Sequence, residues 1–375
     1  MAATGAASTS GYHASSSVDT SPRSVLFVRL SALGDVARSL PVLDAARRSW
    51  PGARLGWVVE ERCAGLLRGH PQLDHLVVLP RQELARAWRS FDLARLARLV
   101  RDSARELVDE PHELAIDLQG NWRSGLVAAA SRAPERVAYA PPFGREGGHR
   151  MATRLVEPPA GVVHEGERAL ALVAACGAGV AGARAHVPLD PARLAAVDAA
   201  LLASDALEPI VLHPGVSGFG ALKAWPAGRW SALAARLSEH APVLVSFGPQ
   251  EERLAQGVVA AAGAARVRLA PACLDVESLA ALLSRARAVV AADTGPLHLA
   301  AALDRPVLGL YGAKDPRRFG PASASGRALA LSAEAWCAPC ERRRCPATTC
   351  MQALDEERVE AALLGLLAPA APVSR

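Results

Sequence analysis

The sequence has few aromatic residues and no long apolar run. Aromatic side chains make up 4% of its 375 residues, which leaves little stacking surface for binding single-stranded nucleic acid. The weakly charged run at residues 169–183 is too short and too rich in small residues to span a bilayer. Residues 1–22 have neither the basic start nor the apolar stretch of a secretory signal, and their Ala, Ser, Thr and Gly content predicts a disordered tail. We therefore expect a cytoplasmic protein that binds no nucleic acid and whose seven cysteines stay reduced.

The Asp-x-Asp pattern that often holds a metal against a nucleotide is also missing. No Asp-x-Asp pair occurs, so the sequence does not predict a divalent metal held against a nucleotide, and we expect no cofactor. Four cysteines share the spacing C-x2-C-x4-C-x4-C, namely Cys337, Cys340, Cys345 and Cys350. They either hold zinc or a cluster, or form a loop with reduced thiols. The spacing is tighter than that of paired zinc knuckles, which favours the loop and no metal.

Lysine is almost absent from a basic chain. Only Lys223 and Lys314 are lysines among 42 Lys and Arg residues, and the net charge is +5. An ammonium and a guanidinium are not interchangeable beside a phosphate, so the two lysines are candidates for contact with one. Arginine is also in excess between residues 118 and 156, which suits a phosphorylated substrate, an anionic membrane surface or a solvated basic face.

Short β-branched runs alternate with stretches of helical period. We expect helices at Ala37–Ser49 and Ala227–Ser238, among others. The expected strands are Val25–Val28, Leu55–Val59, His75–Leu79, Leu114–Asp117, Arg136–Tyr139, Pro209–Leu212, Val243–Phe247, Val267–Arg268, Ala288–Ala291 and Val307–Tyr311. This alternation predicts an α/β fold with parallel sheets, and because it runs twice we expect two Rossmann-like domains facing each other across a cleft.

Three segments follow predicted strands and carry candidate ligand groups. In HPGVSGFGALKAWP, residues 213–226, glycines such as Gly215 allow close approach to a phosphate and Lys223 adds a positive charge. In DTGPLHLAAAL, residues 293–303, a helix begins with free N–H groups that favour an anion. In FGPQEERLAQ, residues 247–256, Glu251 or Glu252 can accept ribose hydroxyls. Each segment also has a purely structural interpretation as a turn or a helix cap.

An isolated acid raises the same choice near the N-terminus. In FVRLSALGDVARSLPVL, residues 27–43, a loop of small residues delivers Asp35 just before a helical pattern. The carboxylate either caps that helix or serves as a general base.

Taken together, several motifs resemble the ADP-heptose:lipopolysaccharide heptosyltransferase family, glycosyltransferase family 9. They are RLSALGD, DLQGNWRSGL, GRE, HEGERALALV, LHPG with KAWP and RW, DTGPLHLAAALDRPVLGLYG, and C-x-P-C with a later C-M. The resemblance covers roughly residues 24–365. It implies a GT-B fold and an inverting, metal-independent transfer of heptose from ADP-heptose to the lipopolysaccharide inner core.

The resemblance also implies a domain organisation. Residues 23–190 are expected to bind the acceptor, a lipid A–Kdo type molecule, and residues 191–353 the ADP-sugar. A final helix at 354–368 is expected to pack back on the N-terminal domain. Because the acceptor is amphiphilic, the enzyme is expected to make peripheral contact with the cytoplasmic face of the inner membrane.

Site residues are carried over position by position. Asp35 is the expected general base, and Lys223 is expected to stabilise the departing diphosphate. The other expected donor-binding residues are Gly215, Glu251, Glu252, Asp293, Thr294, Gly295 and His298. The expected acceptor-binding residues are Arg38, Arg123, Arg145 and His164.

Two positions depart from the family pattern. Arg38 stands where members often have His, and Lys314 stands where Thr is usual.

Three alternatives to heptose transfer also remain at this point: transfer of another nucleotide sugar or to another acceptor, binding of a nucleotide sugar without turnover, and binding of nucleic acid through the basic charge and the cysteines.

Overall fold

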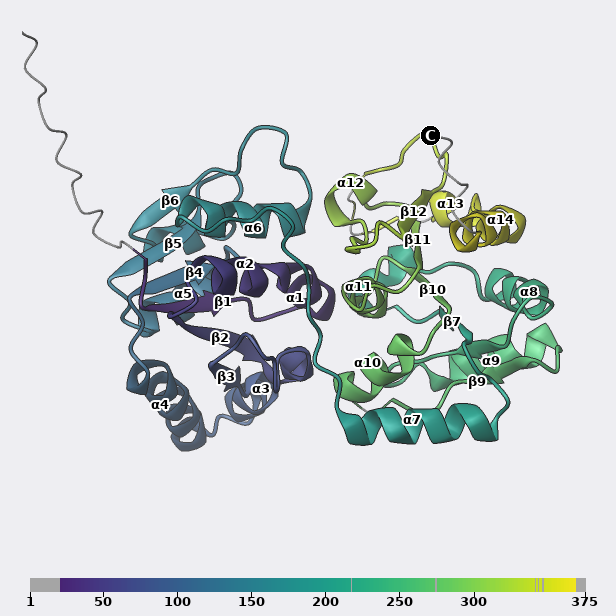
Figure 1. Ribbon diagram of the computed structural model, residues 1–375, viewed down its shortest axis with the longest axis horizontal. Helices are drawn as coiled ribbons and strands as arrows, with labels where there is room; N and C mark the ends of the chain where they lie inside the picture. The colour runs from purple at the N-terminus through teal and green to yellow at the C-terminus, as the bar shows by residue number, and fades with distance from the viewer. Residues whose placement is uncertain are drawn as a thin grey trace, which may run out of the picture.

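The computed structural model describes residues 21–216, 218–273, 275–340, 342, 344–345 and 347–368. Most of the expected tail, residues 1–20, lies outside this range. Below, residues 21–190 are called the N-terminal half and residues 191–368 the C-terminal half. The two halves lie side by side, each built on its own sheet (Figure 1).

The N-terminal half holds a parallel sheet of six strands in the order β3-β2-β1-β4-β5-β6. Its strands are β1 Ser24–Val28, β2 Arg54–Glu60, β3 His75–Leu79, β4 Leu114–Asp117, β5 Glu135–Tyr139 and β6 Arg154–Val156. Its helices are α1 Leu33–Ser39, α2 Pro41–Ser49, α3 Arg81–Arg89, α4 Leu93–Asp109, α5 Trp122–Ala130 and α6 Glu165–Ala175, with the 3-10 turns η1 Glu61–Leu66 and η2 Gly148–Met151.

The C-terminal half repeats this design with the order β12-β11-β10-β7-β8-β9. Its strands are β7 Ile210–His213, β8 Val243–Val245, β9 Val267–Leu269, β10 Ala288–Ala292, β11 Val307–Tyr311 and β12 Ala328–Ser332. Its helices are α7 Pro191–Ala203, α8 Ala227–Leu237, α9 Glu252–Ala262, α10 Val276–Ser284, α11 Gly295–Ala302, α12 Pro316–Phe319, α13 Thr349–Gln352 and α14 Glu356–Leu367, with the turn η3 Gly218–Lys223.

Both sheets have the Rossmann strand order, in which the direction of winding reverses at one pair of neighbouring strands. That pair is β1 and β4 in the first sheet and β7 and β10 in the second. Ligands bind outside the carboxyl ends of the strands at such a switch point. The loops after β1 and β10, which carry Asp35 and Asp293, are therefore the places to look for chemistry.

The buried strand β1 is apolar on both sides because helices cover both faces of its sheet. Val25 and Phe27 join one buried cluster, and Leu26 and Val28 join another that includes Leu107 of α4. A strand buried on both faces is expected to read as a continuous apolar run, as this one does.

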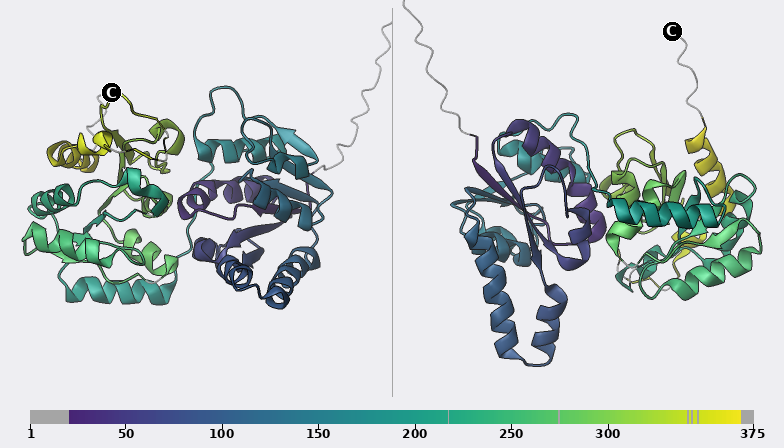
Figure 2. Two further views of the ribbon diagram at one scale, coloured as in Figure 1. Left: turned by 180° about the vertical axis from the view of Figure 1, so that it is seen from behind. Right: turned by 60° about the horizontal axis from the view of Figure 1, so that its bottom comes forward.

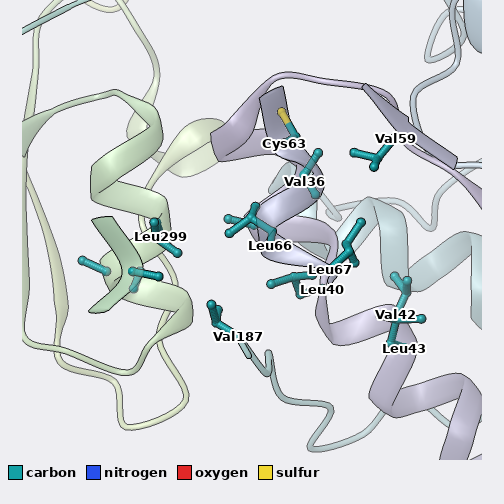
Figure 3. Packing of buried hydrophobic residues seen from close by; sticks show 14 of the residues in the cluster. Val36, Leu40, Val42, Leu43, Val59, Cys63, Leu66, Leu67, Val187 and Leu299 are labelled. Carbon is teal, nitrogen blue, oxygen red and sulfur yellow. The ribbon is translucent and has the colours of Figure 1, made fainter. Parts of the chain in front are cut away.

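One apolar cluster extends across both halves of the molecule. It contains Leu40 and Leu66 of the N-terminal half together with Leu297 and Leu299 of α11. Figure 3 shows Leu299 on one side of this cluster and Leu40 and Leu66 on the other. The halves are therefore joined by buried hydrocarbon as well as by polar contacts.

Two expectations about helices are corrected by the structure. The stretch Ala37–Ser49 forms two helices, α1 and α2, because Pro41 has no N–H to continue the first helix and instead begins the second. The last helix, α14, packs on α8 of its own half and not on the N-terminal half. Its Val359 and Leu363 enter the cluster of the C-terminal half, where Trp230 is buried.

Ion pairs reinforce this packing of α14. Arg229 lies 2.7 Å from Glu356, and Arg236 lies 2.6 Å from Glu360.

The domain boundaries expected from the sequence, with their division at residues 190 and 191, stay a prediction.

Candidate active site

The two switch points face each other because α1 and α11 are in contact. Figure 1 shows these helices side by side between the halves. Glycines permit the approach: a Cβ at Gly34 would lie 2.6 Å from Cδ2 of His298, and one at Gly295 would lie 2.8 Å from Cδ2 of Leu33. Neither position tolerates a side chain without movement of the facing residue.

Asp35 lies in the first turn of α1 and has two roles in the structure. Its Oδ2 accepts a hydrogen bond from the backbone N–H of Ala32 (3.3 Å), so the carboxylate does cap the helix. Its Oδ1 lies 3.3 Å from the guanidinium of Arg29 and also pairs with Arg38. Burial raises the pKa of Asp35, but the two arginines outweigh burial and lower it to about 2. The carboxylate is therefore ionised at neutral pH.

Arg38 links Asp35 to the C-terminal half. Its buried guanidinium donates to the backbone carbonyl of Phe319 (3.0 Å), and its Nη1 lies 3.1 Å from Nε2 of His298. Arg38 thus contacts the expected base on one side and an expected donor-binding residue on the other.

Asp293, His298 and Lys223 form the facing cluster in the C-terminal half. Nζ of Lys223 lies 2.7 Å from Oδ2 of Asp293 and donates to the backbone carbonyl of the same residue (3.0 Å). Nε2 of His298 lies 3.1 Å from Oδ1 of Asp293. Burial and the charge of Arg38 lower the pKa of His298 to about 4, so its ring is neutral at pH 7. Burial raises the pKa of Asp293, but His298 and Lys223 together hold it below its usual range.

The N-terminus of α11 adjoins this cluster. Thr294 is its N-cap residue and Gly295 its first residue, and the Thr294 hydroxyl is buried with no hydrogen-bond partner in the described structure. The free N–H groups and the helix dipole favour an anion at this end.

Glu251 and Glu252, left as alternatives by the sequence, differ in the structure. The carboxylate of Glu251 accepts from the N–H of Gly248 (2.8 Å) and lies 3.5 Å from the buried ring of His213. A Cβ at Gly215 would lie 2.0 Å from its Oε2, so Glu251 and Gly215 are in close contact. Glu252 instead begins α9 and contacts Gln256 at the surface. Glu251 is the one that joins the loops after β7 and β8.

Unlike Arg38, the other three expected acceptor-binding residues contact neither Asp35 nor His298 in the hydrogen bonds and ion pairs of the described residues; each has a different partner. Arg123 pairs with the buried Glu60 (3.3 Å) at the end of β2. Arg145 lies 3.8 Å from Glu165. Nε2 of His164 lies 3.0 Å from the backbone carbonyl of Gly320 in the C-terminal half.

Sequence reasoning missed three charged residues of this region. Arg29 is buried at the end of β1 and faces Asp35. Glu165 and Arg318 form an ion pair of 2.7 Å between the halves. A charge directly after a buried strand was a usable signal for Arg29. The pairing of Glu165 with Arg318 depends on a contact across 153 positions and has no local signal.

The other lysine lies beside an aromatic ring. Nζ of Lys314 is 5.1 Å from the centroid of Phe319, whose ring is also approached by Arg38 and Arg318. Lys314 is therefore placed by a cation–π contact, whereas Lys223 is placed by a carboxylate.

The cysteine segment shows free thiols. Cys337, Cys340 and Cys345 are partly exposed and Cys350 is buried. Over the described residues, no group of three or more His, Cys, Asp or Glu side chains is arranged to hold a metal ion.

None of the described helices has the length and apolar character needed to cross a bilayer.

Gly34 provides a test of the contact between the halves. We expect Gly34→Ala to lower kcat/KM by about 10- to 100-fold, because the new methyl group would meet the His298 ring and displace it, and a misplacement of about 1 Å costs about 100-fold. Gly257→Ala on α9 is the matched control, since nothing lies within 4 Å of a Cβ there; it should keep full activity. Equal activity of both variants in a transfer assay would contradict this account of the contact.

Comparison with known proteins gives a consistent result. The model of glycosyltransferase family 9 (heptosyltransferase) matches residues 100–351. The chain is 32% identical over 334 residues to lipopolysaccharide heptosyltransferase 1 of Pseudomonas aeruginosa, covering 86% of this chain and 87% of that protein. It is 30% identical to the protein of the same name from Escherichia coli K12 over 305 residues, 79% of this chain and 90% of that one.

Solved structures agree. E. coli heptosyltransferase WaaC with ADP superposes with a TM-score of 0.71 at 25% identity, covering 92% of this chain and 99% of that one. The complex of WaaC with ADP-2-deoxy-2-fluoro heptose gives a TM-score of 0.69 at 25% identity, covering 91% and 99%. E. coli ADP-heptose lps heptosyltransferase II gives 0.70 at 19% identity, covering 92% and 98%, a likeness of fold. These matches confirm the predicted GT-B fold.

Proposed function

The chain belongs to glycosyltransferase family 9, the heptosyltransferases, and from this we propose that it transfers heptose from ADP-heptose to the inner core of lipopolysaccharide. The names of the relatives and the ligands of the WaaC structures support this donor and this acceptor. One observation carries the proposal: a single polar network runs from Asp35 through Arg38 to His298, Asp293 and Lys223. It brings a carboxylate of one half opposite a cationic group of the other.

In the proposed reaction, Asp35 takes the proton of an acceptor hydroxyl as its oxygen attacks the anomeric carbon of heptose. The bond from that carbon to the β-phosphate oxygen breaks, and its electron pair leaves with ADP. Attack opposite to the leaving group inverts the anomeric configuration. No Asp-x-Asp pair occurs in the sequence to hold a metal at the diphosphate, so we assign charge stabilisation to Lys223 and the N-terminus of α11.

The low pKa of Asp35 sets a condition on this mechanism. A carboxyl group with a pKa of about 2 is a weak base, since efficient bases have pKa values near the working pH. We propose that an anionic group of the acceptor draws Arg38 away from Asp35, which raises the pKa of Asp35 only when the acceptor is bound. Arg at position 38 would then both recognise the acceptor and control the base.

The remaining contacts of the proposal follow from position. Glu251 and Gly215 are proposed to contact the nucleoside part of the donor, and Thr294 and Gly295 its diphosphate. Arg123, Arg145 and His164 are proposed to hold the acceptor, a lipid A–Kdo type molecule.

The test is a transfer assay with ADP-heptose and a lipid A–Kdo acceptor, with and without EDTA. We expect ADP release and a heptosylated acceptor whose new bond has, by NMR, the anomeric configuration opposite to that of the donor. We also expect the rate to be unchanged by EDTA. Retention of configuration would exclude the single displacement, and loss of activity in EDTA that added metal restores would exclude metal independence. Turnover only with other nucleotide sugars would exclude the proposed donor.

A further inference from the structure

The hairpin of α3 and α4 projects from the N-terminal half, as the right-hand view of Figure 2 shows. Its tip exposes three large apolar side chains within six residues: Trp88 is 66% exposed, Phe91 83% and Leu93 64%. Single exposed apolar residues are common on protein surfaces, whereas a group of them marks an interaction site.

Phe91 occupies a position that disfavours it. Its φ of 54° lies in the left-handed region, just after the end of α3, where glycine or asparagine is usual. A bulky residue with this backbone conformation is strained, and an exposed aromatic ring gains no burial within the protein in return. The ring of Phe91 is thus held in solvent at a backbone position that glycine would occupy at lower cost.

Charge is divided along the hairpin. From residue 84 to residue 101 there are five arginines and one acid, Asp92, which caps α4 by accepting from the N–H of Arg95 (3.0 Å). The side chain of Arg95 pairs with Glu83 (2.8 Å), just outside this range. Acids gather beyond this point, where Asp102, Glu106, Asp109 and Glu110 follow. The tip is thus positive and apolar, and the base of the hairpin is acidic.

We propose that the tip of this hairpin, residues 84–101, docks the enzyme on an anionic lipid bilayer. Trp88, Phe91 and Leu93 enter the interfacial layer, where aromatic rings are favoured, and the arginines contact lipid phosphates. The resemblance implies peripheral contact with the membrane without naming a surface, and the hairpin supplies that surface. Neither interaction involves the donor or the acceptor sugar, so docking does not depend on the proposed reaction.

The position of the hairpin suits such docking. Helix α3 begins two residues after β3 ends, so the hairpin leaves the sheet at the edge formed by the carboxyl ends of the strands. Asp35 follows β1, and β1 lies two strands from β3 in the same sheet, a strand separation of about 10 Å. The hairpin therefore leaves the sheet at the same edge that carries the expected base.

The test is flotation of the full chain with vesicles that contain no lipopolysaccharide. We expect binding to vesicles of phosphatidylethanolamine and phosphatidylglycerol, much weaker binding to phosphatidylcholine vesicles, and release in high salt. The double variant Trp88→Ser, Phe91→Gly should lower the partition coefficient by about 10- to 100-fold. Phe91→Gly suits the left-handed backbone, so its melting temperature should not fall.

The control is Trp336→Ser, because Trp336 is 97% exposed but lies in the C-terminal half. It should bind vesicles like the unchanged chain. The proposal is overturned if the unchanged chain does not bind anionic vesicles, or if the double variant binds as well as the control. It is also overturned if the double variant turns a dimer into a monomer, by light scattering, and leaves vesicle binding intact.

Discussion

Replacing Asp35 with asparagine is expected to lower kcat for heptose transfer by about 10²- to 10⁴-fold, the range typical of removing a general base. Asparagine keeps an oxygen that can accept from the N–H of Ala32, so the cap on α1 is preserved while the base is lost. The variant should still melt at a lower temperature than the unchanged protein, because the buried guanidiniums of Arg29 and Arg38 lose their carboxylate, so kcat is compared well below both melting temperatures. ADP release from ADP-heptose and acceptor is the measurement.

Asp198→Asn is the matched control for this variant. Asp198 also pairs with an arginine, Arg285 at 2.6 Å, but on the outer helix α7. Its replacement should leave kcat within a few fold. If the Asp35 variant kept the rate of this control, Asp35 would be a helix cap only.

The pH dependence of the unchanged enzyme is a second way to distinguish a general base at Asp35 from a residue that only caps its helix. In the free enzyme the pKa of Asp35 is about 2, so its basic form persists as pH falls from neutrality and is lost only near that value. If the acceptor diverts Arg38, the pKa is higher in the complex. The acid limb of kcat, which reports the complex, should then lie at higher pH than the acid limb of kcat/KM, which reports the free enzyme.

Lys223→Met is expected to lower kcat by about 10²- to 10³-fold, comparable to loss of a group that stabilises developing negative charge. The change removes a cation and also leaves the Asp293 carboxylate without its nearest positive partner, beside the proposed diphosphate. Lys223→Arg should recover only part of the rate, since a planar guanidinium does not replace a compact ammonium at this position. The same assay of ADP release measures both.

The other lysine provides the control. Lys314→Met removes a cation that lies over Phe319 and not against Asp293, and it should change kcat by only a few fold. An equal loss in both variants would show that the diphosphate is stabilised by positive charge in general and not by Lys223 in particular.

Much of the fold was predictable because the central strands are buried on both faces. Runs such as Val25–Val28 and Val307–Tyr311 have the continuous apolar character of such strands, and the structure places β1 and β11 there. The edge strands β6 and β12 were missed. β6 has only three residues and β12 is partly exposed, so neither gives a strong pattern.

Single residues of the candidate site could be proposed from the sequence, but the contacts between them could not. Glycine-rich loops and helix starts after apolar strands identified Asp35, Lys223 and Asp293 one at a time. That Arg38 reaches His298 across 260 positions follows from the contact of α1 with α11, and no local pattern encodes it. The same reason explains the error for α14, whose apolar stripe fits either half until its neighbours are known.

The apolar cluster that joins the halves makes the closed arrangement depend on temperature. Separating Leu299 from Leu66 would bring hydrocarbon into contact with water, and the free energy that opposes this exposure weakens on cooling. We therefore expect separation of the two halves to be opposed less strongly in the cold than at higher temperature.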